Sequence, residues 1–430
     1  MMRQLVERLR GRRMSSAGAL AATGMLLVPS VSAATPGPAG TPYARRQPAA
    51  NVAQPVFTNL DMIDTTTGFA WGILNDHYAL WATRDGGVHW QRRHVASLPP
   101  LNAPGTPFPV LNFDNAQQGW IAWITRRGIG KPGSASSHSV ATLTVLHTRD
   151  GGRRWSVYHR RVLGVMREVE QIAFLGKNGW IRVFSGGVMN QGDTGLYHTT
   201  NNGRSWSLVS AASGYVPNPD ATPDALPAMD IPMPMTFTTA NDGWVAVGND
   251  MISHTVASLY HTTTAGRRWF RVLLPVPAPL QHNAYTTTEF QPVFASAGDG
   301  SVLVQFQGDT HGEVIDYRTT DHGKVWTMGT PFQLKASASP LAMSAISPSK
   351  AWVIGVTGGS FGMTQNGGHS WSNLPIAEHL KAVFNGGYRV VSFNMVSSTR
   401  GWMLVEAGNQ KRFALLRTKD GGHSWGIQRW

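Results

Sequence analysis

The 430-residue chain contains no cysteine. Disulfides, a lipoprotein anchor and thiol chemistry are therefore excluded, and the stability of the fold has to come from its core. Charged residues make up only 14% of the chain, and acids are the scarcer kind, with 24 against 37 lysines and arginines. Outside the N-terminus no segment shows a sustained helical stripe of apolar residues, which favours a β protein.

The N-terminal 33 residues have the pattern of a signal peptide. A basic stretch with five arginines is followed by a mostly apolar run at 17–28, and Val31-Ser32-Ala33 offers small residues to signal peptidase. The apolar run is too short for a comfortable membrane span. Residues 34–55 are rich in Pro, Ala and Gly, which predicts a flexible linker. We therefore expect a secreted or extracytoplasmic protein, exported by either the general or the twin-arginine route.

Basic charge is in excess. The formal net charge is +13, and removal of a leader with five arginines and one glutamate would leave +9. Such a surface favours anionic cell-surface polymers through long-range attraction, unless the charge is scattered and serves solubility alone. We expect no nucleic-acid partner, because no Lys/Arg run interleaved with aromatics occurs beyond the leader.

One eight-residue phrase occurs seven times. Its form is Thr-x-Asp-x-Gly-x-x-Trp, with Asn201, Thr264 and Asn366 standing in place of the aspartate in three of the copies. The aspartates can accept turn N–H groups, the glycine permits φ > 0, and the tryptophan can anchor the returning strand. Successive tryptophans are 65, 51, 63, 57, 45 and 54 residues apart, which is the period of a blade. The predicted structural residues of the phrase are Asp85, Trp90, Asp150, Trp155, Trp206, Trp269, Asp321, Trp326, Trp371, Asp420 and Trp425.

A Gly-Trp motif precedes each phrase by about one strand pair, clearest at Gly119-Trp120, Gly179-Trp180, Gly243-Trp244 and Gly401-Trp402. Each period then holds four short strands, A to D. The Gly-Trp motif lies at the A–B turn and the phrase at the C–D turn. The prediction is an all-β fold over 56–430: a seven-bladed β-propeller of four-stranded antiparallel blades.

These motifs resemble the Asp-box, or BNR, repeat of sialidases and other propellers. With the added Gly-Trp motif, the set is most similar to bacterial propellers related to the photosystem II stability/assembly factor. The resemblance covers roughly residues 56–430 and implies the architecture, whereas activity resides in sites that differ between members of one fold. We name the eight-residue phrase the box below.

Long connections predict where a partner binds. The D–A and B–C connections share one face of a propeller, here the loop face, and include residues 96–109, 126–139, 211–234, 275–291 and 331–340. Recognition tends to use such loops on a rigid scaffold. We expect 211–234 to be replaceable by a short turn with loss of binding and little loss of stability. The candidate binding residues on this face are Asp193, Asp220, Asp224, Asp230, Asp250 and Asp309.

No metal or other cofactor is expected. Asp220, Asp224 and Asp230 match no calcium-loop spacing. His147, His198 and His261 recur at one repeat position on separate blades, which indicates a shared structural role. Most of the sixteen tryptophans fall in the two motifs and are therefore core rather than a carbohydrate-stacking surface.

Three functions remain in competition. The first is a secreted, non-catalytic binding or assembly scaffold, expected to be a monomer, that recognises a protein or an anionic surface polymer or glycan. The second is a glycoside hydrolase, which would need two convergent carboxyl groups. Its candidate acids are Asp193, Asp250, Asp309, Glu313 and Glu406, although the Arg-Ile-Pro motif of sialidases is missing. The third is a carbohydrate-binding lectin or adhesin with salt-dependent affinity.

Overall fold

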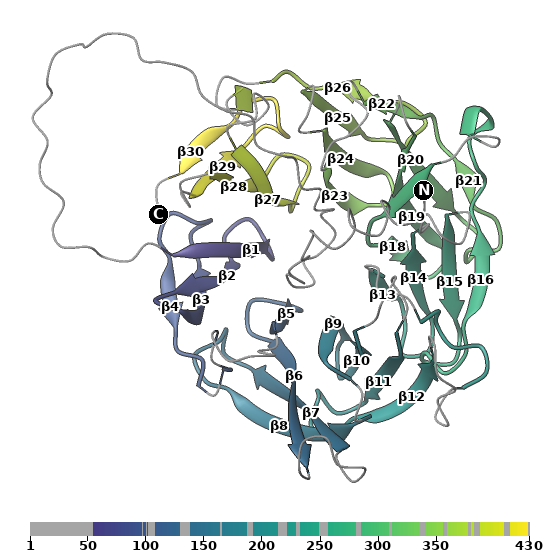
Figure 1. Cartoon of the computed structure of the whole chain (residues 1–430). Helices are drawn as coiled ribbons and strands as arrows, with labels where there is room; N and C mark the ends of the chain where they lie inside the picture. The colour runs from purple at the N-terminus through teal and green to yellow at the C-terminus, as the bar shows by residue number, and fades with distance from the viewer. Residues whose placement is uncertain are drawn as a thin grey trace, which may run out of the picture.

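Seven antiparallel sheets form a closed ring in the computed structural model (Figure 1). The structure describes residues 55–428, with gaps at 97, 100, 102–107, 130–137, 164–165, 187–191, 214–221, 229–232, 249–256, 281–284, 309–311, 335–340, 356–358, 377–379, 382–387 and 408–412. The predicted signal peptide and nearly all of the predicted linker lie outside the described residues. Within the described residues, no helix is both long and apolar enough to cross a membrane.

Blades 1 to 4 each have four strands in simple sequence order. Blade 1 has β1 (Val56–Met62), β2 (Gly68–Leu74), β3 (His77–Thr83) and β4 (Gln91–Arg93), and blade 2 has β5 (Val110–Phe113), β6 (Gly119–Ile129), β7 (His138–Thr148) and β8 (Ser156–Val162). Blade 3 has β9 (Glu168–Leu175), β10 (Asn178–Phe184), β11 (Thr194–Thr199) and β12 (Ser207–Ala212), and blade 4 has β13 (Met235–Phe237), β14 (Gly243–Val247), β15 (Ser258–Thr262) and β16 (Phe270–Leu273).

Blades 5 to 7 complete the ring, and blade 5 is interrupted. After a short 3₁₀ helix, η1 (Ala278–Leu280), it has β17 (Thr286–Glu289), β18 (Val293–Ser296), β19 (Asp299–Gln307), β20 (Gly312–Thr319), β21 (Thr327–Met328) and β22 (Phe332–Leu334). Blade 6 has β23 (Leu341–Ser347), β24 (Lys350–Gly355), β25 (Ser360–Thr364) and β26 (Ser372–Asn373), and blade 7 has β27 (Tyr388–Met395), β28 (Gly401–Ala407), β29 (Phe413–Thr418) and β30 (Gly426–Gln428).

The seven-bladed architecture predicted from the repeats is confirmed. Blade 5 has six strands because two of its four strand positions are split. Strands β17 and β18 both pair β19, and β21 and β22 both pair β20. Pro292 and Pro331 lie at these breaks, where a residue without an N–H cannot continue a ladder. The segments 275–291 and 331–340, which we expected to be loops, therefore contain the strands β17 and β22.

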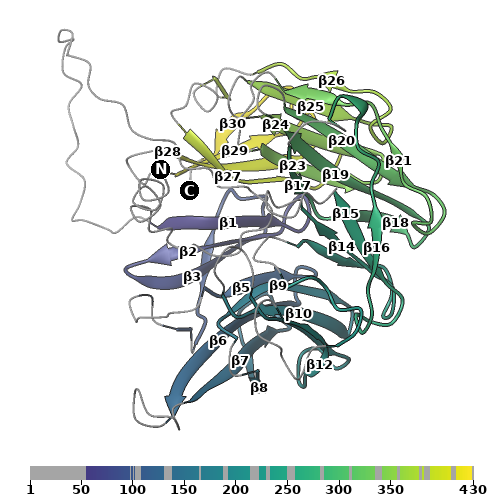
Figure 2. The same cartoon turned by 45° about the vertical axis from the view of Figure 1, so that its right-hand side comes forward.

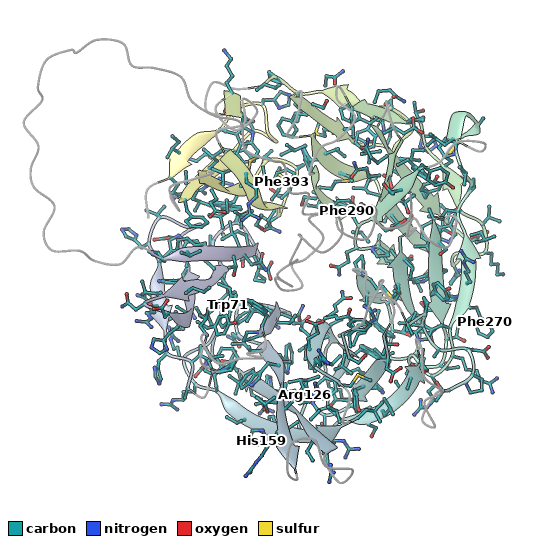
Figure 3. The ribbon with its side chains drawn as sticks, in the orientation of Figure 1. Trp71, Arg126, His159, Phe270, Phe290 and Phe393 are labelled. Carbon is teal, nitrogen blue, oxygen red and sulfur yellow. The ribbon has the colours of Figure 1, made fainter. Side chains whose placement is uncertain are left out.

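The ring closes without a shared strand. The last blade lies beside the first, yellow against purple in Figure 1, and Figure 2 shows the sheets fanned around one axis. Asn394 Oδ1 accepts the Met62 N–H at 2.9 Å, and Ser392 Oγ donates to the Leu60 carbonyl at 2.8 Å. These two bonds join the innermost strands of blades 1 and 7. The outer rim of the ring is more exposed: Phe270, labelled in Figure 3, is 55% exposed.

The box is a hydrogen-bonded turn. In all seven copies the threonine Oγ1 accepts the N–H of the second glycine, as for Thr83 and Gly87 at 2.9 Å. That glycine has positive φ, +84° at Gly87, which favours glycine. Asp321 Oδ1 accepts the Thr319 hydroxyl and the Val325 N–H. The Val325 and Thr319 hydrogen bonds lower the pKa of Asp321. These carboxylates are engaged by their own turn.

Four boxes accept a hydrogen bond from the preceding blade. In blades 2, 3, 6 and 7 the indole N–H of the Gly-Trp motif donates to a box carbonyl of the next blade, as from Trp120 to Asn202 at 3.2 Å and from Trp180 to Ala265 at 3.0 Å. The Trp120 ring also stacks on Phe174 of that blade, with centroids 3.5 Å apart. Across its own sheet Trp120 stacks on His147 at 4.8 Å. His198 and His261 hold the same place beneath Trp180 and Trp244, which is the shared role their repeat position predicts.

Candidate functional site

The connections at the loop face of blade 3 hold the best-described candidate residue, Asp193. Its Oδ1 accepts the Ser213 hydroxyl at 3.1 Å, and its N–H donates to Ser185 Oγ at 2.8 Å. The Ser185 N–H returns a bond to the Asp193 carbonyl at 2.9 Å. Asp193 therefore ties the ends of β10, β11 and β12 together.

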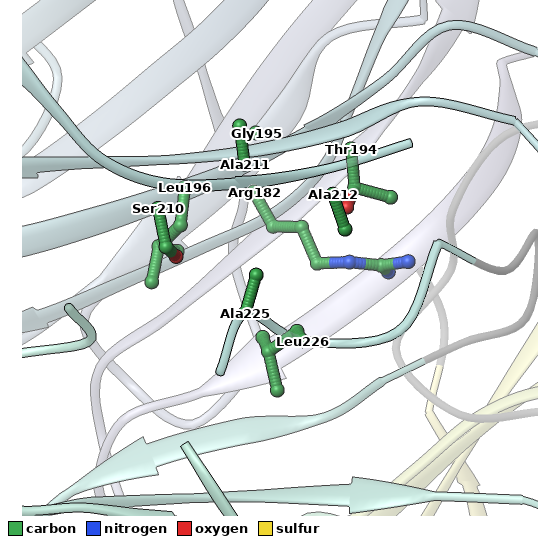
Figure 4. Close-up of a pocket in the computed structure, with 9 residues that line it drawn as sticks. All are labelled: Arg182, Thr194, Gly195, Leu196, Ser210, Ala211, Ala212, Ala225 and Leu226. Atoms are coloured by element: carbon green, nitrogen blue, oxygen red, sulfur yellow. The ribbon is translucent and has the colours of Figure 1, made fainter. Parts of the chain in front are cut away.

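A buried ion pair lies beside this point. Arg182 Nη1 is 2.6 Å from Glu170 Oε2, and the Arg182 side chain is only 2% exposed. Figure 4 shows Arg182 in a small pocket with Thr194, Ser210 and Leu226. The pocket admits about one water molecule, so it cannot hold a sugar ring. A buried pair of this kind fixes geometry more than it adds stability.

Asp224 does not join Asp193. Its carbonyl accepts the N–H of Trp269 at 2.7 Å, which places it at the box end of blade 4. Leu226 and Met233, 4% and 3% exposed, pack in the core with Trp180 and Trp269. Part of segment 211–234 is thus core, and a short turn there would remove buried apolar side chains. This corrects the expectation that the exchange would spare stability.

The remaining candidate acids do not converge in the described part of the chain. Glu313 accepts a hydrogen bond from Gln333 at 2.7 Å, and Glu406 pairs with Arg389 at 2.5 Å. These pairs belong to blades 5 and 7. Asp220, Asp230, Asp250 and Asp309 lie outside the described residues.

Three carboxyls not singled out from the sequence have strongly raised pKa values, and that of Asp114 is raised as well. Burial raises the pKa of Asp61 to about 6, of Glu289 to about 7 and of Asp316 to about 8. Asp316 occupies the β20 position that holds a leucine in four other blades, so an alignment of the repeats would reveal it. The leucines are Leu80, Leu196, Leu259 and Leu415.

The two raised carboxyls of blade 5 face opposite neighbours. A Cβ built on Gly248 of blade 4 would lie 2.6 Å from Glu289 Oε2. A Cβ built on Gly368 of blade 6 would lie 2.6 Å from Asp316 Cβ. Asp61 belongs to blade 1. These three groups therefore form no pair of the kind that glycoside hydrolysis requires.

The described residues contain no group of three His, Cys, Asp or Glu side chains that could hold a metal ion. The repeated histidines are stacked on tryptophans instead. Burial first, and then the charges of Arg149 and Arg204, lower the pKa of His147 to about 4. His147 is therefore neutral at physiological pH.

Comparison with known proteins finds no matching family model and no matching curated protein. Among solved structures, an ulvan lyase of polysaccharide lyase family PL25 has 10% identity and a TM-score of 0.49, over 87% of this chain and 96% of that one. A GH93 α-L-arabinofuranosidase of Fusarium graminearum has 11% identity and a TM-score of 0.37, over 69% and 92%. The Aleuria aurantia lectin, crystallised with a methyl fucoside, has 9% identity and a TM-score of 0.37, over 84% and 90%.

Proposed function

We propose that this chain is an extracytoplasmic, non-catalytic propeller that binds a protein or a surface glycan through its loop face. It would be exported by its leader and belong with the Asp-box propellers that its motifs resemble. The observation that carries the proposal is the separation of three perturbed acids: Asp61 lies in blade 1, Glu289 faces blade 4 and Asp316 faces blade 6. Within the described part of the chain, none of the three therefore supplies another with the second carboxyl that hydrolysis needs at about 5–9.5 Å.

The loop face offers a built projection for recognition. Strands β6 and β7 are 11 residues each, longer than the other strands, and pair continuously out to Ile129 and His138. Arg126 and Arg127 lie near the end of this hairpin and are exposed. Burial and then the charge of Arg167, on the next blade, lower the pKa of Arg126. Paired strands hold such side chains more firmly than an irregular loop does.

The test uses this hairpin, because segment 211–234 contributes to the core. A variant in which 129–138 is replaced by Asn-Gly keeps the paired strands and removes the tip. On a glycan array, the native protein should bind a defined set of glycans and the variant should lose that set with unchanged thermal unfolding. Equal binding by both would refute the loop-face assignment.

A glycoside hydrolase is the second candidate, and Glu289 favours it. It lies on β17, an innermost strand, and a pKa near 7 suits a general acid. A panel of chromogenic glycosides should show no turnover by the native protein. Turnover that disappears in E289Q would replace the binding proposal by the enzymatic one.

A further inference from the structure

The face opposite the loops carries an arc of exposed basic side chains. It is formed by the boxes of blades 2, 3 and 4, three neighbouring sheets whose colours run from blue to green in Figure 1. Lys177, in the A–B turn of blade 3, adds to it. The six exposed arginines that define the arc are Arg149, Arg153, Arg154, Arg204, Arg267 and Arg268.

Two of these three boxes have lost their carboxylate without losing the turn. In blade 3, Asn201 Oδ1 accepts the Thr199 hydroxyl at 2.9 Å and the Ser205 N–H at 3.0 Å. In blade 4, Thr264 Oγ1 accepts the Arg268 N–H at 2.9 Å. In the boxes of blades 1 and 7 the same acceptor is an anion: Asp85 accepts the His89 N–H, and Asp420 accepts the Ser424 N–H. The departures from aspartate therefore change charge, not geometry, and two of them lie within the arc.

Four acidic side chains lie near the arc and do not cancel its positive charge. Asp150 accepts the N–H groups of Arg153 and Arg154, both at 2.9 Å. Asp242 accepts the Thr238 hydroxyl at 2.6 Å and lies 2.9 Å from His261 Nε2. Asp114 and Asp224 are exposed at its edges. Among the described residues, the six arginines and Lys177 thus outnumber the four acids.

The positive charge of the arc also lowers the pKa values of neighbouring basic groups. After burial, the charges of Arg149 and Arg204 lower the pKa of His147, and the charge of Arg267 lowers that of His198. The pKa of Arg93 is lowered by burial and then by Arg153 and Arg84, although Asp150 opposes this. Positive charges of consecutive blades are therefore close enough to act on the same groups.

We propose that this arc is a second binding surface, for a linear polysaccharide bearing repeated sulfate or carboxylate groups. Guanidinium groups recognise such anions in bidentate fashion, and one set per blade matches a polymer with regularly spaced charge. A membrane fits less well. The large exposed apolar side chains beside the boxes of the arc are Val157, Leu175 and Phe270, one on each blade, against seven basic side chains.

The sharpest test restores the missing carboxylates. N201D and T264D recreate the commoner box, so both should fold, and each adds one negative charge to the arc. The matched control is N366D, the same change in the blade 6 box, where Asn366 makes the same bonds to Thr364 and Ser370. Binding of the full chain to fluorescent dextran sulfate, with neutral dextran as the reference polymer, measures the effect.

The expected results follow from simple electrostatics. Affinity for dextran sulfate should fall about threefold in N201D and about tenfold in the double variant, while N366D stays within about twofold of the native protein. Neutral dextran should not bind. Equal losses in N201D and N366D, or no binding by the native protein at about 50 mM salt, would overturn the proposal.

Two further arms identify the chemistry. Polygalacturonate tests carboxylate against sulfate as the anionic group. Tighter binding of duplex DNA than of either polysaccharide would also overturn the proposal, because it would show unspecific attraction to any polyanion.

Two more variants test the location of the surface. R204Q with R267Q should reproduce the loss seen in the double variant, since it removes charge from the same blades. The hairpin variant with 129–138 replaced should bind dextran sulfate normally, which separates this surface from the loop face.

Discussion

Trp402 donates its indole N–H to the Gly86 carbonyl at 3.0 Å, a bond between the last blade and the first. The same bond joins Trp352 to Gly421 at 2.9 Å between blades 6 and 7. The bond that joins blade 7 to blade 1 is therefore of the same kind as the bond that joins blade 6 to blade 7. Because the first and last blades share no strand, ring closure relies on contacts of this kind.

Removing this bond should destabilise the ring by the same amount at either place. W402F leaves the Gly86 carbonyl without its indole donor and removes part of a fully buried ring, so it should lower the free energy of unfolding by about 2–3 kcal/mol. W352F, the matched variant, should cost the same within about 0.5 kcal/mol. Urea unfolding followed by fluorescence measures both. A cost in W352F and none in W402F would mean that the ring is open in solution.

A buried carboxyl of blade 5 should make the stability of the protein depend on pH. Asp316 is 1% exposed, at a position where four other blades have leucine, and Ser301 stands where the other blades have a large ring. Burial raises the pKa of Asp316 to about 8, while the Ser301 hydrogen bond and the Arg318 charge oppose this. Between pH 3.8 and 8 the unfolded chain loses this proton and the folded chain keeps it. Stability should therefore fall as pH rises through this window.

Replacing Asp316 by leucine tests that dependence. At pH 8, D316L should raise the free energy of unfolding by about 3 kcal/mol, and its pH profile should be flatter than that of the native protein. D316N, of similar shape and without charge, should flatten the profile with a smaller gain. A native profile that rises between pH 5 and 8, and is unchanged by D316N, would contradict the assignment.

His147 should make stability depend on pH in the opposite direction, with a loss of stability at acid pH. Its pKa is lowered to about 4 from 6.5 by burial and nearby arginines, so the unfolded state takes up a proton first as pH falls. Stability from this group is lost between pH 6.5 and 4. H147F keeps an aromatic ring against Trp120 and should reduce the acid-side loss in thermal unfolding at pH 5. An unchanged difference between pH 7 and pH 5 would argue against a neutral, buried imidazole.

The box threonine should matter through its oxygen. Thr262 is fully buried, and its Oγ1 accepts the Gly266 N–H at 3.0 Å and the Thr264 N–H at 3.1 Å. T262V keeps the shape but removes the acceptor, which should cost about 1–3 kcal/mol. T262S retains the acceptor and should cost under about 1 kcal/mol. Equal costs in a denaturant titration would assign the loss to the methyl group.

The fold could be predicted because one motif fixes one corner of every blade. The Gly-Trp and box spacings locate the A–B and C–D turns, and antiparallel pairing supplies the rest. The interruptions of blade 5 were less accessible, since Pro292 and Pro331 look like ordinary loop residues until β18 and β22 are seen to resume the ladder.

The candidate site was harder to predict, for a physical reason. The long connections have no repeat to fix their path, so sequence could not show that Asp224 turns toward Trp269 while Asp193 stays at the loop face. The type of a residue likewise does not show whether its side chain is buried. Asp316 becomes recognisable only by comparison with the leucines at its repeat position.

Incubation with polysaccharides of known length tests most directly whether this propeller binds glycans without cleaving them. Native protein is mixed with dextran sulfate or polygalacturonate, and both complex formation and polymer length are followed by size-exclusion chromatography. A complex and an unchanged polymer length are expected from a propeller that binds without cleaving. Polymer shortened by the native protein and left intact by E289Q would contradict this expectation.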